Sequence, residues 1–241
     1  SIIILGVGIM MGAYWAYETL NFGGYWNWDP VENAVYVPWL FLVASLHSII
    51  LTQKNNQNYK MSLILCITSF VLILYSTFLT RSGILGDSSV HSFTDLGLSG
   101  QLLVYLFSFV LISVYLLVSR WKEIPYSDKE AKTYTGDFWL FIGVYTLILM
   151  SFQVILPTSI PVYNAIVEAF GGFSNLAPPV EKELFYSNAQ IWFASSLALL
   201  SSIAQVLWWR GKQAKEKFSL FSKSLALTMI SSSLIILFYP I

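Results

Sequence analysis

The residues best suited to bind a ligand are the aromatic and acidic side chains of residues 23–34, which read Gly-Gly-Tyr-Trp-Asn-Trp-Asp-Pro-Val-Glu-Asn-Ala. Trp26 and Trp28 offer flat apolar surfaces, and Asp29 and Glu32 place two carboxyl groups close by. The Gly-Gly and Asp-Pro steps indicate a turn. Because apolar runs flank this segment on both sides, we interpret it as a platform for a flat, partly charged ligand at a membrane surface.

The two acidic residues admit a second interpretation. Asp29-Pro30 favours a turn, and Pro30 is suited to open a helix with Glu32 in its first turn. In that case the two carboxyl groups cap the helix and match its dipole. In the other case they orient a ligand or hold the loop against it. The sequence leaves both interpretations open.

The chain has two histidines, in different settings. His47 lies in an apolar run, where an ionisable residue is costly and is a functional hypothesis by default. It is either a neutral imidazole hydrogen-bonded between helices or an axial ligand of an iron porphyrin, for which imidazole is a standard ligand. His91 lies in a loop and is ordinarily a solvated residue. If that loop faces the same side of the membrane as Trp26 and Trp28, an iron ligand and the flat apolar faces of the tryptophan rings lie close together.

The composition is that of an integral membrane protein. The 241 residues are 56% hydrophobic and 11% charged, against about 25% charged residues in a typical soluble domain. A formal net charge of zero gives no sign of nucleic-acid binding. The single cysteine, Cys66, excludes an internal disulfide and a cysteine-based metal cluster. Phosphate-binding glycine loops, nucleophile elbows and HExxH motifs are absent from the sequence.

Seven apolar stretches approach the length of about 20 residues that spans a bilayer as a helix. They are residues 1–20, 35–53, 61–80, 98–119, 138–157, 188–209 and 219–239. The sequence therefore predicts an all-α, polytopic membrane bundle of about seven transmembrane helices. We expect one transmembrane domain over residues 1–241, as a fragment of a longer protein, and a short extra helix at 162–170.

Charge alternates between the connecting loops. Eleven of the thirteen basic residues fall in three segments, 53–60, 120–137 and 210–223. Cytoplasmic loops carry the excess of lysine and arginine. The alternate loops therefore face outward, and they are residues 21–34, 81–97 and 158–187. Most tryptophans near predicted helix ends fit an aromatic belt at the membrane interface, whereas Trp15, Trp26 and Trp28 fit that interpretation less well.

Two sequence blocks resemble a known family. Residues 23–34, followed by Pro38-Trp39-Leu40, resemble the WWD motif of the haem-handling proteins of cytochrome c maturation. With the lead-in at 12–18, the WWD motif region spans residues 12–40, and the resemblance as a whole covers residues 12–100. The second block, Thr77-Phe78-Leu79-Thr80-Arg81-Ser82-Gly83-Ile84-Leu85 with Ser89-Val90-His91-Ser92-Phe93, favours the CcmF branch over the CcsA branch. A weaker similarity is present at Ala177-Pro178-Pro179 and Tyr186-Ser187-Asn188.

The resemblance implies roles for individual residues. It assigns Trp26, Trp28 and Asp29 to the core of a haem-binding surface, with Trp15 and Glu32 beside them. It makes His91 a ligand to the iron of a delivered haem. His47 becomes a ligand to the iron of a permanent haem b. The family's other outward histidine and other membrane histidine have no counterpart among these residues.

Arg81 is the only basic residue in the first two outward loops. We hypothesise that it pairs with a haem propionate. The alternative is a side chain that extends from a helix end to the membrane interface.

The resemblance also implies a function. The family receives haem from a carrier protein and attaches its vinyl groups to the thiols of a Cys-x-x-Cys-His segment in an apocytochrome c. The expected role is a haem lyase subunit that works with other cytochrome c maturation subunits in the bilayer, with quinol as a further expected partner. The expected location is the bacterial inner membrane with the WWD loop facing the periplasm, or an organelle inner membrane. The alternatives are a haem transport or delivery platform without ligation activity, and a membrane scaffold with structural histidines.

Overall fold

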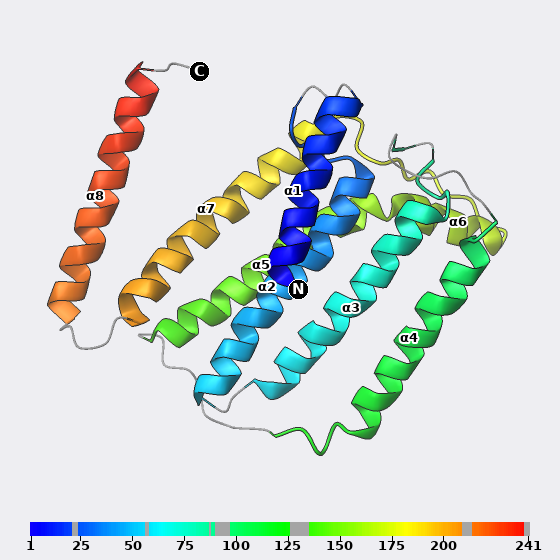
Figure 1. The fold of residues 1–241 in the computed structure, drawn as a ribbon, viewed down its shortest axis with the longest axis horizontal. Coiled ribbons are helices and arrows are strands. Elements are labelled where there is room, and N and C mark those ends of the chain that lie inside the picture. The colour runs from blue at the N-terminus through cyan, green and yellow to red at the C-terminus, as the bar shows by residue number, and fades with distance from the viewer. Residues whose placement is uncertain are drawn as a thin grey trace.

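A computed structural model of the protein describes residues 1–20, 24–55, 58–86, 88–89, 97–125, 135–208 and 214–238 (Figure 1). These residues form eight α-helices and no strand. The helices are α1 (Ile2–Thr19), α2 (Pro30–Asn55), α3 (Tyr59–Arg81), α4 (Ser99–Ser119), α5 (Gly136–Thr158), α6 (Ile160–Ala169), α7 (Lys182–Trp208) and α8 (Ala214–Phe238).

The predicted all-α membrane bundle is confirmed. Within the described residues, six helices are long and apolar enough to cross a membrane, and these are α1, α2, α3, α4, α5 and α7. The seventh predicted stretch, 219–239, falls on α8, which is not among these six. The short helix expected at 162–170 is α6.

Two helices begin earlier than the apolar stretches that predicted them. α2 begins at Pro30 instead of residue 35, and α7 begins at Lys182 instead of residue 188. Hydropathy marks only the lipid-compatible part of a helix, whereas a first turn is often polar because its backbone N–H groups need acceptors. As a result, the last residues of the WWD motif form the first turn of α2.

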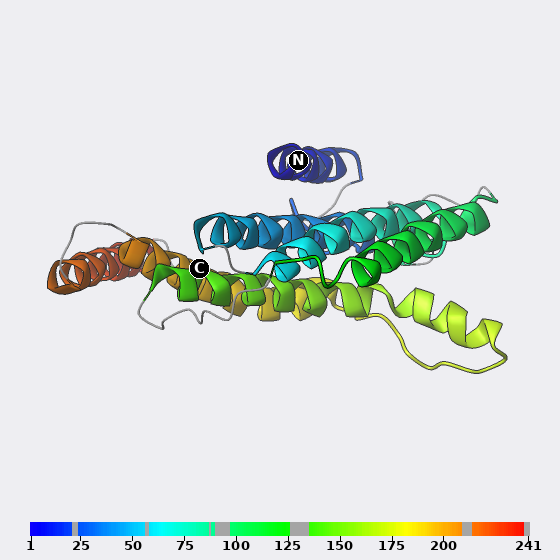
Figure 2. The ribbon, with the colours of Figure 1, turned by 90° about the horizontal axis from the view of Figure 1, so that it is seen from below.

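α2 and α5 occupy the centre of the bundle. α2 contacts α1, α3 and α5, while α5 contacts α2, α6 and α7, and α4 packs on α3. Figure 2 shows α1 set apart on the α2 side and α8 at the edge beyond α7. The main core combines side chains of α2, α3, α5 and α7 with Trp28 from the loop before α2. The outer surface of α4 is apolar and exposed, as at Val104 and Leu111, which is expected of a helix facing lipid.

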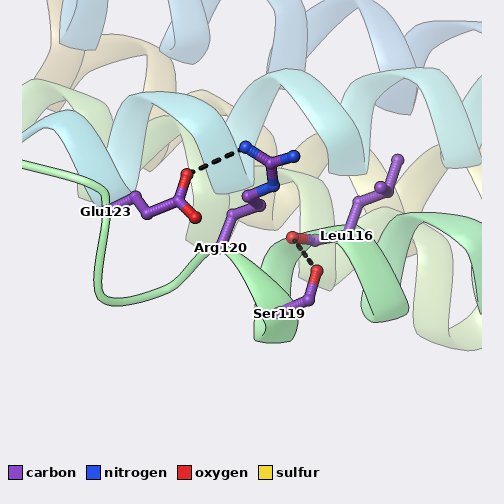
Figure 3. A network of polar contacts seen from close by, with 4 residues as sticks. All are labelled: Leu116, Ser119, Arg120 and Glu123. Carbon is purple, nitrogen blue, oxygen red and sulfur yellow. Dashed lines mark hydrogen bonds and ion pairs between the residues drawn. The ribbon is translucent and has the colours of Figure 1, made fainter.

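The described parts of four loops pair at opposite ends of the bundle. At one end, Lys60 Nζ lies 4.4 Å from the centre of the Trp121 ring, so the loops before α3 and after α4 are neighbours. Arg120 and Glu123 form an exposed ion pair of 2.9 Å at this end (Figure 3). At the opposite end, Lys182 Nζ donates a hydrogen bond to Ser88 O at 2.6 Å. The second and third predicted outward loops therefore meet.

Candidate functional site: the aromatic loop before α2

The loop before α2 is fixed by a backbone turn at Trp28. This residue has a φ of +52°, a left-handed conformation that is uncommon for a bulky side chain. Asn33, in the first turn of α2, donates from Nδ2 to Trp28 O and to Thr158 Oγ1, at 3.2 Å in each case. One buried amide thus joins the turn to α5 and holds the strained residue in place.

The Trp28 side chain points into the protein and is 8% exposed. Its indole N–H donates a hydrogen bond to Ser187 Oγ at 2.9 Å. Its ring stacks on Tyr186, with ring centres 5.4 Å apart and planes inclined by 26°. Tyr186 and Ser187 both belong to α7, so Trp28 fastens the loop to a helix that is distant in sequence.

Asp29 and Glu32 form a capping arrangement at the start of α2. Asp29 Oδ2 accepts from the Val31 N–H at 3.1 Å, and Glu32 Oε2 accepts from the Asp29 N–H at 3.1 Å. Glu32 Oε2 also accepts from the Asn27 N–H at 3.0 Å. With Pro30 as the first helical residue, this reciprocal pattern satisfies N–H groups that the helix leaves unpaired. The capping interpretation is therefore confirmed, and a ligand-binding role stays a prediction.

Trp26 is half-buried and lies closer to the surface than Trp28. Its ring meets Trp28 at 5.8 Å and Tyr36 at 5.7 Å between ring centres, edge to face in both cases. The buried indole Nε1 of Trp26 has no hydrogen-bond partner in the described part of the chain. Trp26, Trp28 and Tyr36 therefore form one group of aromatic rings in mutual contact.

An apolar groove of about 1010 Å³ lies between α1, this loop and α2. Its aromatic lining is Tyr14, Trp15, Tyr25, Trp26, Trp28, Tyr36 and Trp39. Two polar contacts shape its rim, from Tyr14 Oη to Glu18 Oε1 and from Tyr25 Oη to Met10 O, each 2.5 Å long. A groove with apolar walls and few polar groups is typical of sites that bind flat hydrophobic ligands.

His47 lines a second cavity, of about 600 Å³, between α2, α5 and α7. Its Nδ1 lies 2.8 Å from Val43 O. Because a carbonyl oxygen only accepts, Nδ1 carries the proton in the neutral ring, and the lone pair remains on Nε2. Nε2 makes no hydrogen bond to another described residue, and a histidine anchored in this way is suited to bind a metal through Nε2.

Of the two remaining predicted residues, the structure describes Arg81, at the end of the bundle that carries the aromatic loop. Arg81 is the last residue of α3 and is exposed. His91 lies outside the described residues. Ser89, two positions earlier in the chain, is buried and donates from Oγ to Asp29 Oδ2.

The structure therefore separates the predicted residues into two places. Trp26, Trp28, Asp29 and Glu32 lie together, with Trp15 across the groove. His47 is seventeen residues along α2 from Pro30, which corresponds to about 26 Å of helix.

The sequence patterns did not predict which side chains support the loop, and these are Asn33, Tyr36, Thr158, Tyr186 and Ser187. The weak family similarity at residues 186–188 was the available signal for two of them.

The fold and the site together define a multi-pass helical membrane protein with an aromatic groove between α1, the loop before α2 and α2 itself. A family model described as "Cytochrome C assembly protein" matches residues 1–85. The chain is 33% identical over 212 residues to the cytochrome c-type biogenesis protein CcmF of Haemophilus influenzae, covering 88% of this chain and 31% of the relative. It is 29% identical over 233 residues to CcmF of Escherichia coli K12, covering 97% of this chain and 35% of the relative.

A shorter match, 50% identical over 91 residues, is to CycK of Bradyrhizobium diazoefficiens and covers 38% of this chain and 14% of the relative. No solved structure gives a significant match. The chain belongs to the CcmF-type family of cytochrome c biogenesis proteins, and it spans about a third of the length of the two CcmF relatives.

Proposed function

We propose that this chain is the haem-presenting part of a cytochrome c maturation subunit. The aromatic loop and the groove beside it hold haem for attachment to an apocytochrome c. The observation that supports this most directly is the groove of about 1010 Å³ lined by Trp15, Trp26 and Tyr36. Aromatic rings give a porphyrin plane large apolar contacts without requiring a charged partner.

The groove suits haem for a second reason, which is its rigidity. Trp28 is locked to α7 and α5, and the capping contacts of Asp29 and Glu32 fix where α2 begins. A rigid platform contributes by orienting two reactants, here the haem and the Cys-x-x-Cys-His segment. In this proposal His91 ligates the delivered iron, and Arg81 pairs with a propionate. The haem and the thiols supply the covalent chemistry, so the chain needs no nucleophile of its own.

We further infer a permanent haem b in the cavity beside His47. The residues present fit such a group, because His47 keeps the Nε2 lone pair and lines an apolar cavity of about 600 Å³. Haem b would supply electron transfer, with quinol as the reductant. The partners in this proposal are a haem carrier protein, the apocytochrome and other maturation subunits. The proposed location is the bacterial inner membrane, with the aromatic loop in the periplasm.

Spectroscopy of the protein expressed from its complete reading frame tests both sites. His47→Ala should abolish the b-type haem spectrum, whereas Leu46→Ala, which removes an exposed neighbour on α2, should leave it unchanged. His91→Ala and Trp26→Ala should weaken haem received from the carrier and lower cytochrome c formation. Normal spectra in both histidine variants would overturn the ligand assignments. Haem capture with no cytochrome c formation in the unmodified protein would favour the delivery platform instead.

A further inference from the structure

α6 and the loop that follows it form a compact unit beside the end of the bundle (Figure 2). α5 ends at Thr158, and α6 begins two residues later at Ile160, with Pro161 in its first turn. The chain then returns through residues 170–181 to the start of α7. This unit therefore lies at the level where the membrane-spanning helices end.

α6 has two chemically distinct sides. Tyr163, Ile166 and Phe170 follow the i, i+3, i+7 spacing of one helix face, and they are 51%, 52% and 88% exposed. Asn164 and Glu168, four residues apart, share the opposite side. The exposed apolar face is thus a continuous stripe rather than scattered side chains.

The polar side of α6 holds the following loop. Asn164 Nδ2 donates to Leu176 O at 2.9 Å, and Ser174 Oγ donates to Asn164 Oδ1 at 2.6 Å. Gly171 adopts a φ of +75° after the helix, as a helix-ending glycine does. Phe173 is nevertheless 85% exposed. These contacts fix the loop in one conformation. Its apolar side chains are therefore exposed on an ordered segment.

α6 packs on the same core cluster as α4, a helix whose outer surface is apolar and exposed. Val162 of α6 packs on the same core cluster as Leu102 and Leu103 of α4, and the rest of α4 exposes apolar side chains along its length. Residues 160–180 contain one charged residue, Glu168. A surface of aromatic and aliphatic groups with so little charge is suited to contact lipid. A surface that binds another protein usually has a polar rim as well.

We propose that α6 and residues 170–180 form an interfacial anchor, with Tyr163, Ile166, Phe170 and Phe173 inserted at the boundary between lipid headgroups and acyl chains. Amphipathic helices with aromatic side chains bind membranes in this way. The anchor is independent of haem binding. It fixes the depth of the third predicted outward loop, residues 158–187, relative to the bilayer.

Fluorescence in defined bilayers tests this proposal. The protein from its complete reading frame, with Cys66 and any other native cysteine replaced, receives a single cysteine at Phe170 or Phe173 that carries a polarity-sensitive fluorophore. It is reconstituted into phosphatidylcholine vesicles with bromine near the headgroup end of the acyl chains. The emission should shift to the blue and be quenched severalfold more than at the matched position Glu168→Cys. Bromine at the far end of the chains should quench less.

Three results would overturn the proposal. Water-like emission at both phenylalanine positions would show that the stripe faces solvent. A blue shift without bromine quenching would show that protein covers it. Equal quenching at Glu168 would show that the helix is immersed rather than interfacial. If Phe170→Cys does not accumulate, Phe173→Cys and Val180→Cys, both outside α6 and strongly exposed, decide the same question.

Discussion

The indole N–H of Trp28 donates a hydrogen bond to Ser187 Oγ across 2.9 Å, which joins positions 159 residues apart in the sequence. This contact divides the tryptophans of the WWD motif by role. All three line the groove, but Trp28 is buried and bonded to α7, whereas Trp26 and Trp15 are more exposed and lie on the two sides of the groove. The distinction separates the side chain that holds the loop in place from those that, in the proposed function, contact the haem.

Replacing Trp28 by alanine should mainly destabilise the protein. Removal of a buried tryptophan side chain costs about 3–5 kcal/mol in protein cores, and here the Tyr186 stacking and the Ser187 hydrogen bond are lost as well. Thermal unfolding in detergent should show a much larger loss for Trp28→Ala than for Trp26→Ala. Trp26→Ala should instead impair haem capture by a protein of nearly normal stability. The reverse order would contradict the assignment of roles.

Ser187→Ala should leave the Trp28 N–H buried without an acceptor. Such a group costs about 1–3 kcal/mol. Paired with Trp28→Phe in a double-mutant cycle, the two changes should be strongly non-additive, because each removes the same hydrogen bond. Ser195→Ala is the matched control on α7, since its exposed hydroxyl donates to Ile191 O within its own helix. Additive effects of Ser187→Ala and Trp28→Phe would show that the bond contributes little.

Glu32 should act through its hydrogen bonds rather than through its charge. Glu32→Gln keeps an acceptor for the N–H groups of Asn27 and Asp29, so stability and haem capture should change little. Glu32→Leu removes the acceptor and should cost about 0.5–2 kcal/mol, the usual effect of losing a helix cap. Chemical denaturation and haem titration of both variants measure the two effects. Loss of haem capture in a stable Glu32→Gln protein would reveal a direct role of the charge at the ligand.

Ser62 should hold α3 against α2. Its buried Oγ lies 2.8 Å from Ser48 Oγ and 2.8 Å from Thr52 Oγ1, which joins two membrane helices by hydroxyl groups. Hydrogen bonds between membrane helices contribute about 0.6 kcal/mol each on average, so Ser62→Ala should lower stability by about 1 kcal/mol. Thr77→Ala, whose exposed hydroxyl contacts Ile73 O in its own helix, should be neutral in the same unfolding assay. Equal losses in the two variants would rule out this interhelical role.

Local chemistry made much of the fold predictable. Apolar length located the helices, because a bilayer requires every backbone polar group to be bonded within a helix. Asp29-Pro30 with Glu32 predicted the start of a helix, and the capping contacts confirm it. The apolar stretches alone placed the beginnings of α2 and α7 several residues too late, since first turns are polar and hydropathy does not detect them.

The sequence by itself determined three things. They are the helical membrane class, the placement of the three predicted outward loops at one end of the bundle, and the family to which the motif belongs. These properties follow from hydropathy, charge and short-range patterns. Only the tertiary structure decided that Trp28 is buried on Tyr186, that the groove lies between α1 and α2, and that His47 faces a separate cavity. Each depends on packing between residues far apart in the chain, and helix periodicity does not specify which neighbour a given face will meet.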